Sequence, residues 1–226
     1  MPKISIIIPV LNEAAIIQKT IIPLLDHSDI EIIVADGGSI DNTQALVKEL
    51  GVKLIISPGG GRSNQMNLGA RIATGEILLF LHGDTQLPSG YQGIIREILS
   101  QPQTIAGAFQ LKIDGEKWSL RLVEIMVNWR SHFFSLPYGD QAIFLKTSSF
   151  EQIGGFSQLP IMEDYELIRR LQTKGKITIA PHPVLTSSRR WEKLGVFQTT
   201  LINQLIILGY FLGIPPVKLA QLYRGK

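Results

Sequence analysis

The sequence predicts an α/β protein with a central, mostly parallel sheet and helices on both of its faces. Short β-branched runs alternate with helical stretches along the first third of the chain, which is typical of βαβ units. The chain has 226 residues, of which 45% are hydrophobic and 18% charged, enough apolar material for one substantial core. Because no linker, repeat or low-complexity segment interrupts it, we expect one domain over residues 1–226.

Four strands are expected in the first half of the chain. They are apolar runs bounded by turn residues, at Ile4–Pro9, Glu31–Ala35, Val52–Ile56 and Glu76–Leu81, and such runs are typical of strands buried on both faces. Helices are expected between them, at about Ala14–Leu25, from Asp41 onward, and at about Ser63–Ala73 after a glycine-rich turn at residues 59–61. Sheets of this kind bind ligands beyond the carboxyl ends of their strands.

The second half is less regular and is expected to extend the same sheet. A strand is predicted at Ala106–Ile113, an amphipathic helix at about Trp118–Phe134, another helix at Glu163–Lys174, and a helical segment at about 195–224. Residues 201–212 are apolar but shorter than the roughly 18–20 residues that span a bilayer. Three interpretations stay open for this segment: a helix packed on the core, a homodimer surface, or a helix lying on a membrane face.

Composition and charge exclude several classes of site. The chain has no cysteine, which excludes disulfides, cysteine metal sites and thiol catalysis. Its 22 basic residues are scattered among 19 acidic ones, whereas nucleic-acid binding favours a basic stripe; the surplus indicates a small anionic ligand. The apolar run Ile4–Leu11 is too short for a signal peptide, so we expect a cytoplasmic protein, with a peripheral position at the inner membrane face as the alternative.

Polar residues follow the first two predicted strands. Pro9 leads to Asn12 and Glu13, and Asn12 is either a ligand contact or a helix cap. Asp36 comes directly after its strand, and an acid there can accept hydrogen bonds from a nucleobase or ribose. Asp41 is expected to be a helix cap.

Two further polar clusters lie later in the chain. His82 and Asp84 project to the same side of an extended strand end. They predict a site for Mn²⁺ or Mg²⁺ bridging diphosphate oxygens, although His82 has the alternative role of a hydrogen-bonded wall residue. The neighbours Glu163 and Asp164 open a predicted helix; one of them suits the helix N-terminus, which leaves the other free to act as a base.

In their order along the chain, these segments resemble the inverting glycosyltransferases of family 2, which have the GT-A fold. The resemblance covers roughly residues 4–176 and rests on Pro9–Glu13, Val34–Thr43, Asn67–Arg71, Ala73–Asp84, Gly154–Phe156 and Glu163–Asp164. It implies that Asp36 contacts the nucleobase, that Asp84 is the metal-binding end of a DxD-type motif, and that Asp164 is the catalytic base.

The chain departs from the family pattern at two places. Gly37 stands where a second aspartate is common, and His82 replaces the first acid of the DxD motif. These departures keep a non-catalytic nucleotide-sugar-binding protein open as an alternative. The form of the motif around His82 is similar to that of a small bacterial subgroup found beside radical-enzyme or arsenosugar genes, as are three later runs, Tyr138–Gln141, Pro160–Leu167 and Ser187–Trp191.

The predicted function is therefore transfer of a sugar from a nucleotide-diphosphate sugar to an unidentified hydroxyl acceptor, either a small molecule or a lipid-linked one. The leaving diphosphate needs cationic neutralisation and the acceptor needs a base. No separate nucleophile for a retaining route is evident in the sequence. A sugar nucleotidyltransferase is disfavoured because no glycine-rich phosphate loop follows the first strand. The predicted nucleotide-sugar-binding residues are Pro9, Asn12, Glu13, Asp36, Arg62, Arg71, Asp84 and Arg190, with catalytic Asp164 and Glu163, and metal ligands Asp84 and His82.

Overall fold

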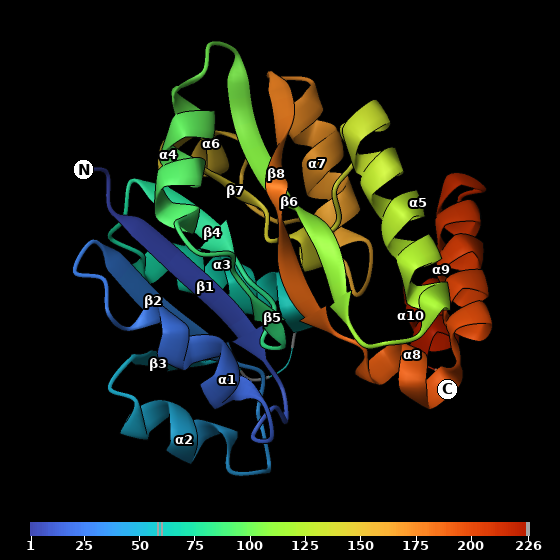
Figure 1. The fold of residues 1–226 in the computed structure, drawn as a ribbon, viewed down its shortest axis with the longest axis horizontal. Coiled ribbons are helices and arrows are strands. Elements are labelled where there is room, and N and C mark those ends of the chain that lie inside the picture. Colours follow the sequence, from blue (N-terminus) through green and yellow to red (C-terminus); the bar gives the residue numbers. More distant parts are fainter. Residues whose placement is uncertain (58, 60, 225–226) are drawn as a thin grey trace.

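A central sheet organises the protein, as the computed structural model shows for residues 1–57, 59 and 61–224 (Figure 1). Within these residues the sheet has eight strands in the order β3-β2-β1-β4-β7-β6-β8-β5. Their bounds are β1 Ile4–Val10, β2 Ile30–Asp36, β3 Lys53–Ile56, β4 Ile77–Phe80, β5 Thr85–Gln86, β6 Thr104–Asp114, β7 Phe144–Lys146 and β8 Lys176–Ser187. The pairs β1–β2, β1–β4, β2–β3 and β6–β8 are parallel. Strand β7 pairs antiparallel with β4 and β6, and β5 pairs antiparallel with β8.

Helices cover both faces of this sheet, as the sequence predicts. Their bounds are α1 Ile17–Ile21, α2 Thr43–Glu49, α3 Gly61–Ile72, α4 Tyr91–Ser100, α5 Trp118–Phe134, α6 Thr147–Gln152, α7 Glu163–Gln172, α8 Arg189–Leu194, α9 Val196–Phe211 and α10 Pro216–Arg224, with 3₁₀ turns η1 Ile22–Leu24 and η2 Gly139–Gln141. Side chains alternate along β1, so that Ile6 and Ile8 pack with α1, α4 and α5, while Ile7 packs with α3, α6 and α7.

Several predicted boundaries differ from the structure. The expected helix at Ala14–Leu25 is only α1 followed by η1, which carries Pro23 at its start. The expected helix at Ser63 begins two residues earlier, at Gly61. The twelve-residue strand β8 has no counterpart in the prediction. Its Pro181 and Pro183 lie at a register shift against β6, and prolines inside a run argue against a strand.

Two amide side chains of α3 hold the carboxyl ends of β1 and β2 and the turn before α7. Asn67 donates to the carbonyl oxygen of Phe156 over 2.8 Å and accepts from its backbone nitrogen over 2.9 Å. Gln65 donates to the carbonyl oxygens of Val10 and Ala35, at 2.8 and 2.7 Å. These contacts satisfy backbone groups at the ends of β1 and β2 and fix the turn before α7.

The C-terminal helices pack against the start of α7. Ile206 of α9 and Leu219 of α10 form a small buried cluster with Met162 and Tyr165. In the portion of the chain that the structure describes, no helix is both long and apolar enough to cross a bilayer.

Gly75 precedes β4 at a point where there is no room for a side chain. A Cβ there would lie 2.7 Å from the backbone nitrogen of Ser5 and 2.8 Å from the carbonyl oxygen of Lys3. Because backbone cannot move aside cheaply, Gly75→Ala should lower the free energy of unfolding by about 1–3 kcal/mol. Gly93→Ala, where a Cβ meets nothing within 4 Å, is the matched control. Equal midpoints for both variants in urea would contradict this packing.

Candidate active site

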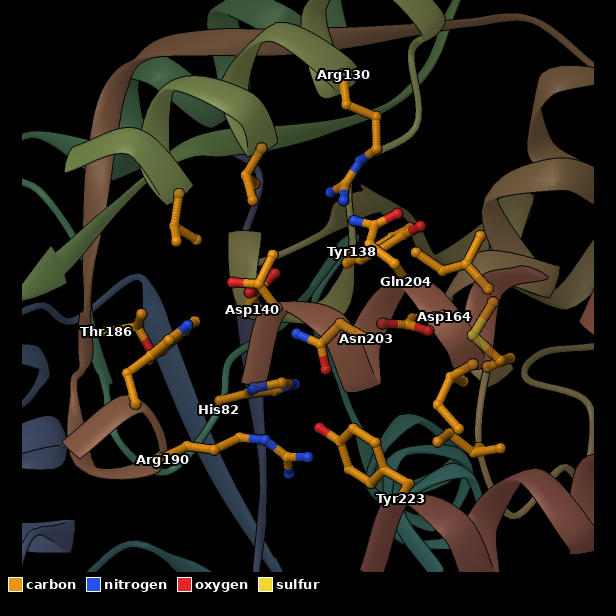
Figure 2. Close-up of a pocket in the computed structure, with 18 of the residues that line it drawn as sticks. His82, Arg130, Tyr138, Asp140, Asp164, Thr186, Arg190, Asn203, Gln204 and Tyr223 are labelled. Carbon is orange, nitrogen blue, oxygen red and sulfur yellow. The ribbon is translucent and has the colours of Figure 1, made fainter. Parts of the chain in front are cut away.

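A cavity of about 820 Å³ lies where the carboxyl end of β4 meets the C-terminal helices (Figure 2). This is the side of the sheet at which the sequence predicts ligand binding. Its charged lining residues come from segments far apart in the chain: Arg62, His82, Asp84, Arg130, Asp140, Glu163, Asp164 and Arg190. The cavity therefore brings together four carboxylates, three guanidinium groups and an imidazole.

Arg62, in the first turn of α3, contacts three of these groups. Its Nε donates to Oε1 of Glu163 over 2.5 Å, and its Nη1 lies 3.1 Å from Nε2 of His82. Its Nη2 lies 3.9 Å from Oδ2 of Asp164. Glu163 is only 2% exposed, so Arg62 balances a buried negative charge. The sequence predicts Arg62 as a nucleotide-sugar-binding residue, and the structure adds this ion pairing.

Asp164 is the more exposed carboxylate of the adjacent pair that lines the cavity, at 14% against 2% for Glu163. Its Oδ2 accepts from the backbone nitrogen of Gly139 over 2.7 Å, and its Oδ1 accepts from that of Tyr165 over 2.7 Å. Each carboxylate oxygen has a second lone pair, so the group keeps accepting capacity toward the cavity. Glu163 is instead committed to Arg62.

His82 has the geometry of a hydrogen-bonded wall residue. Burial first, and then the nearby positive charge of Arg62, lower the pKa of His82 to about 4. The ring is therefore neutral near pH 7, and its Nε2 accepts from Arg62. Within the described residues, no group of three or more His, Asp or Glu side chains is placed to hold a metal ion.

Asp84 forms an ion pair with Arg189. The Nη2 of Arg189 lies 2.7 Å from Oε2 of Glu13 and 3.2 Å from Oδ2 of Asp84. The side chain of Asp84 remains 27% exposed. A single accessible carboxylate suits a hard divalent ion that takes its other ligands from a diphosphate and water, so the donor chemistry at Asp84 fits Mn²⁺ or Mg²⁺.

Asp36 and Asn12 hold the loops after β2 and β1. Asp36 is fully buried, and its Oδ1 accepts from the backbone nitrogens of Gly38 and Ser39 at 2.9 and 2.8 Å. Its Oδ2 is buried without a partner in the described structure. Asn12 joins the loops by accepting from the backbone nitrogen of Ile40 over 2.9 Å. Contact between Asp36 and a nucleobase stays a prediction.

Of the eight predicted binding residues, Arg62, Asp84 and Arg190 line the cavity. Asn12, Glu13 and Asp36 lie in the loops described above and do not line it, and neither do Pro9 and Arg71. Pro9 is buried within β1, paired with Ala35 of β2. Arg71 is exposed in the last turn of α3. A helix of this length places Arg71 about 13 Å along the axis from Arg62, so only the first turn of α3 reaches the cavity.

Asp140 lines the cavity and has no role in the sequence prediction. Its Oδ1 is buried without a hydrogen-bond partner among the described residues. Burial raises the pKa of Asp140 to about 6, Arg130 opposes the rise and Asp164 adds to it. The Tyr138–Gln141 run is the signal in the sequence, but η2 is a single 3₁₀ turn, too short for a periodic pattern to show which way its side chains point.

Arg190 presents unused hydrogen-bond donors in the cavity wall. Its Nε and Nη2 are buried and have no partner in the part of the chain that the structure describes. Its guanidinium group stacks 3.7 Å above the ring of Tyr223, which belongs to α10. A buried guanidinium with unsatisfied donors is suited to an anionic ligand.

Solved structures share the architecture of this chain. The mannosyltransferase PcManGT from Pyrobaculum calidifontis, solved with GDP-Man and Mn²⁺, matches with a TM-score of 0.67 and 18% identity, over 82% of this chain and 56% of that one. Residues 1–349 of TarS from S. aureus, in complex with UDP, match with a TM-score of 0.66 and 18% identity, over 93% of this chain and 70% of that one. These matches show that the fold is GT-A.

Relatives detected by sequence have similar descriptions. A GalNAc(5)-diNAcBac-PP-undecaprenol beta-1,3-glucosyltransferase from Campylobacter jejuni is 35% identical over 99 residues, which are 40% of this chain and about a third (32%) of the relative. A PGL/p-HBAD biosynthesis glycosyltransferase from Mycobacterium tuberculosis is 26% identical over 90% of this chain and 82% of the relative.

The model of one protein family matches most of the chain. It is described as glycosyl transferase family 2 and covers residues 5–159, from the start of β1 to the turn before α7. This protein therefore belongs to glycosyl transferase family 2.

Proposed function

We propose that this protein transfers a sugar from a nucleotide-diphosphate sugar to a hydroxyl acceptor with inversion at the anomeric carbon. The observation that carries the proposal is the position of Asp164, whose carboxylate faces a cavity that also holds Asp84 and the unpartnered donors of Arg190. One carboxylate base and a cationic site for the leaving group are what a single displacement requires.

Asp164 would accept the proton of the acceptor hydroxyl as that oxygen attacks the sugar. The backbone nitrogen of Gly139 fixes one of its carboxylate oxygens, which orients the base before substrate arrives. The Nη2 of Arg62 lies 3.9 Å from the same carboxylate oxygen. Glu163 acts through Arg62, as a positioning residue for this guanidinium group.

The leaving diphosphate would be neutralised on the other side of the reaction. Arg190 has free donors for its oxygens, and Arg189, beside it in α8, can exchange Asp84 for a phosphate while keeping Glu13. Asp84 would hold Mn²⁺ or Mg²⁺, which supplies further positive charge to the leaving group. The Mn²⁺ in the Pyrobaculum calidifontis complex supports this cofactor.

The proposed acceptor is a lipid-linked hydroxyl, and the proposed subgroup is a small bacterial one. The Campylobacter jejuni relative is named for an undecaprenol-linked substrate, which supports a lipid-linked acceptor. The runs Tyr138–Gln141 and Ser187–Trp191 support the small bacterial subgroup found beside radical-enzyme or arsenosugar genes. The alternative is a non-catalytic nucleotide-sugar-binding protein. It is supported by His82, because Nε2 of this residue accepts a hydrogen bond from Arg62.

Asp164→Asn tests the base directly. Asparagine keeps the size and accepting oxygen of the side chain but cannot take a proton, so we expect nucleoside diphosphate release to fall by about 10²–10⁴-fold. Release is measured with UDP-, GDP- and dTDP-sugars plus an acceptor extract and Mn²⁺. Nucleotide binding, measured as a rise in the melting temperature, should be retained.

Glu97→Gln is the matched control for Asp164→Asn, because Glu97 is an exposed acid on α4. It should release nucleoside diphosphate as the parent does. Parent-level release by Asp164→Asn would refute the catalytic assignment. Absence of release from every donor by the parent, with nucleotide binding intact, would favour the non-catalytic binder.

Asp84→Asn tests the metal site. Removing the charge should raise the Mn²⁺ concentration needed for half-maximal binding by at least about tenfold, measured by electron paramagnetic resonance of Mn²⁺ in the presence of UDP or GDP. Asp114→Asn, which changes an acid exposed to 55%, is the control. Unchanged Mn²⁺ binding in Asp84→Asn would show that the ion is held elsewhere.

Asp140→Asn should make stability less dependent on pH. The pKa of Asp140 is about 6 in the folded protein against an ordinary 3.8, so the folded state favours the protonated acid and loses stability as pH rises between these values. We therefore expect the variant to melt at least about 2 °C above the parent near pH 8, with the difference vanishing toward pH 4. Asp26→Asn, on an exposed loop, is the control, and a constant difference at all pH values would contradict the shift.

A further inference from the structure

Helix α5 exposes an apolar stripe along its outer side. Trp118, Leu122, Met126, Trp129 and Phe133 are 75, 50, 51, 54 and 67% exposed. Their spacing of three or four residues places them on one face of the helix, while Leu120 and Val123 pack inward on the core. Large side chains are thus turned outward along the whole length of α5.

Helix α9 exposes a second stripe of the same kind. Phe197, Leu201, Leu205, Leu208 and Phe211 are 83, 47, 45, 55 and 63% exposed. Helices α5 and α9 contact each other and stand side by side at one edge of the molecule (Figure 1). We call these two stripes together the α5–α9 surface. Contiguous exposed apolar area of this kind marks an interaction site.

The α5–α9 surface reaches the cavity described above. Met126 and Trp129 are exposed residues of the α5 stripe and also line the cavity. From α9, the amide side chains of Asn203 and Gln204 project into it (Figure 2). An amphiphilic molecule lying against this surface can therefore extend its polar part into the cavity.

Basic residues predominate around the α5–α9 surface: helices α5, α8, α9 and α10 contain seven Lys and Arg residues against two Glu, while the exposed acids Asp114 and Glu116 precede α5. From Lys193 to the C-terminus the sequence contains no Asp or Glu, and Lys193 and Lys218 are exposed. In α5 the acid is Glu124, which is paired with Arg121 over 3.0 Å. Apolar and aromatic side chains with a basic surround are typical of helices that lie in the interface of an anionic bilayer.

A second copy of this chain fits the same charges less well. In a two-fold dimer the same patch faces itself, which would bring the basic residues of both copies together. An anionic lipid surface is complementary to them instead.

We propose that the α5–α9 surface docks on an anionic lipid bilayer and presents a lipid-borne hydroxyl acceptor to Asp164. The apolar part of the acceptor stays against Met126 and Trp129, and its polar head passes Asn203 and Gln204 into the cavity. The choice of acceptor rests on the proposed transferase function, whereas docking itself does not depend on it.

Vesicle binding tests the docking. The parent should sediment with vesicles of equal parts phosphatidylglycerol and phosphatidylcholine, and less at high salt. Two of the three tryptophans, Trp118 and Trp129, lie on the α5–α9 surface. Brominated lipid should therefore quench most of the tryptophan fluorescence.

A variant with Leu122→Gln, Phe133→Gln, Leu205→Gln and Leu208→Gln changes the α5–α9 surface without touching a cavity-lining residue. It should reduce vesicle partitioning at least about tenfold while its melting temperature still rises with nucleotide. The control, Ile22→Gln with Ile72→Gln, changes exposed apolar residues outside this surface and should partition as the parent does.

Two results would overturn the docking proposal. One is that the parent partitions to the vesicles no more strongly than the four-site variant does. The other is a lipid-free dimer in sedimentation velocity that the four-site variant abolishes, which would assign the surface to a second copy. Vesicle binding together with parent-level transfer by Asp164→Asn would instead refute the proposed function and leave docking intact.

Discussion

The guanidinium group of Arg62 is the interaction on which the site depends. It joins the first turn of α3 to His82 after β4 and to Glu163 at the start of α7, segments that are separated by 20 and 101 residues from it in the sequence. Glu163 is almost completely buried. Removing the cation would leave an unpaired buried carboxylate, which typically costs about 3–5 kcal/mol.

This network divides the acidic residues of the cavity by role. Glu163 is neutralised by Arg62, and Asp164, its neighbour, is turned to the cavity and held by a backbone nitrogen. Asp84 is balanced by Arg189 at the rim, whereas Asp140 has a buried oxygen, Oδ1, that has no partner among the described residues. Different surroundings thus give four carboxylates different chemistry, which is how one cavity can supply a base and a cation site.

The sequence predicts the parallel half of the sheet well because β1, β2 and β4 are buried on both faces and therefore read as uninterrupted apolar runs. It predicts β8 poorly, since its prolines occupy an irregular stretch of an otherwise long strand. Some motif residues turn out to brace the fold: Asn67 holds the backbone of Phe156.

For the site, the sequence locates Asp84, Asp164 and Arg190 but cannot separate Arg62 from Arg71. Both lie on α3, and only the path of the chain decides that the first turn of this helix faces the cavity while the last turn points away. Asp140 and Tyr223 carry no local pattern, because the short 3₁₀ turn η2 and the last helix, α10, bring them to the cavity. Such residues become visible only with the tertiary structure.

The most direct test is a crystal structure with a nucleoside diphosphate and Mn²⁺, in which the anomalous signal of manganese locates the ion independently of any model. We expect an ion on the carboxylate of Asp84, a diphosphate contacting Arg190, and Asp164 facing the space left for the sugar. A nucleotide bound outside the cavity, or an ion bound by Asp164 instead of Asp84, would contradict this expectation.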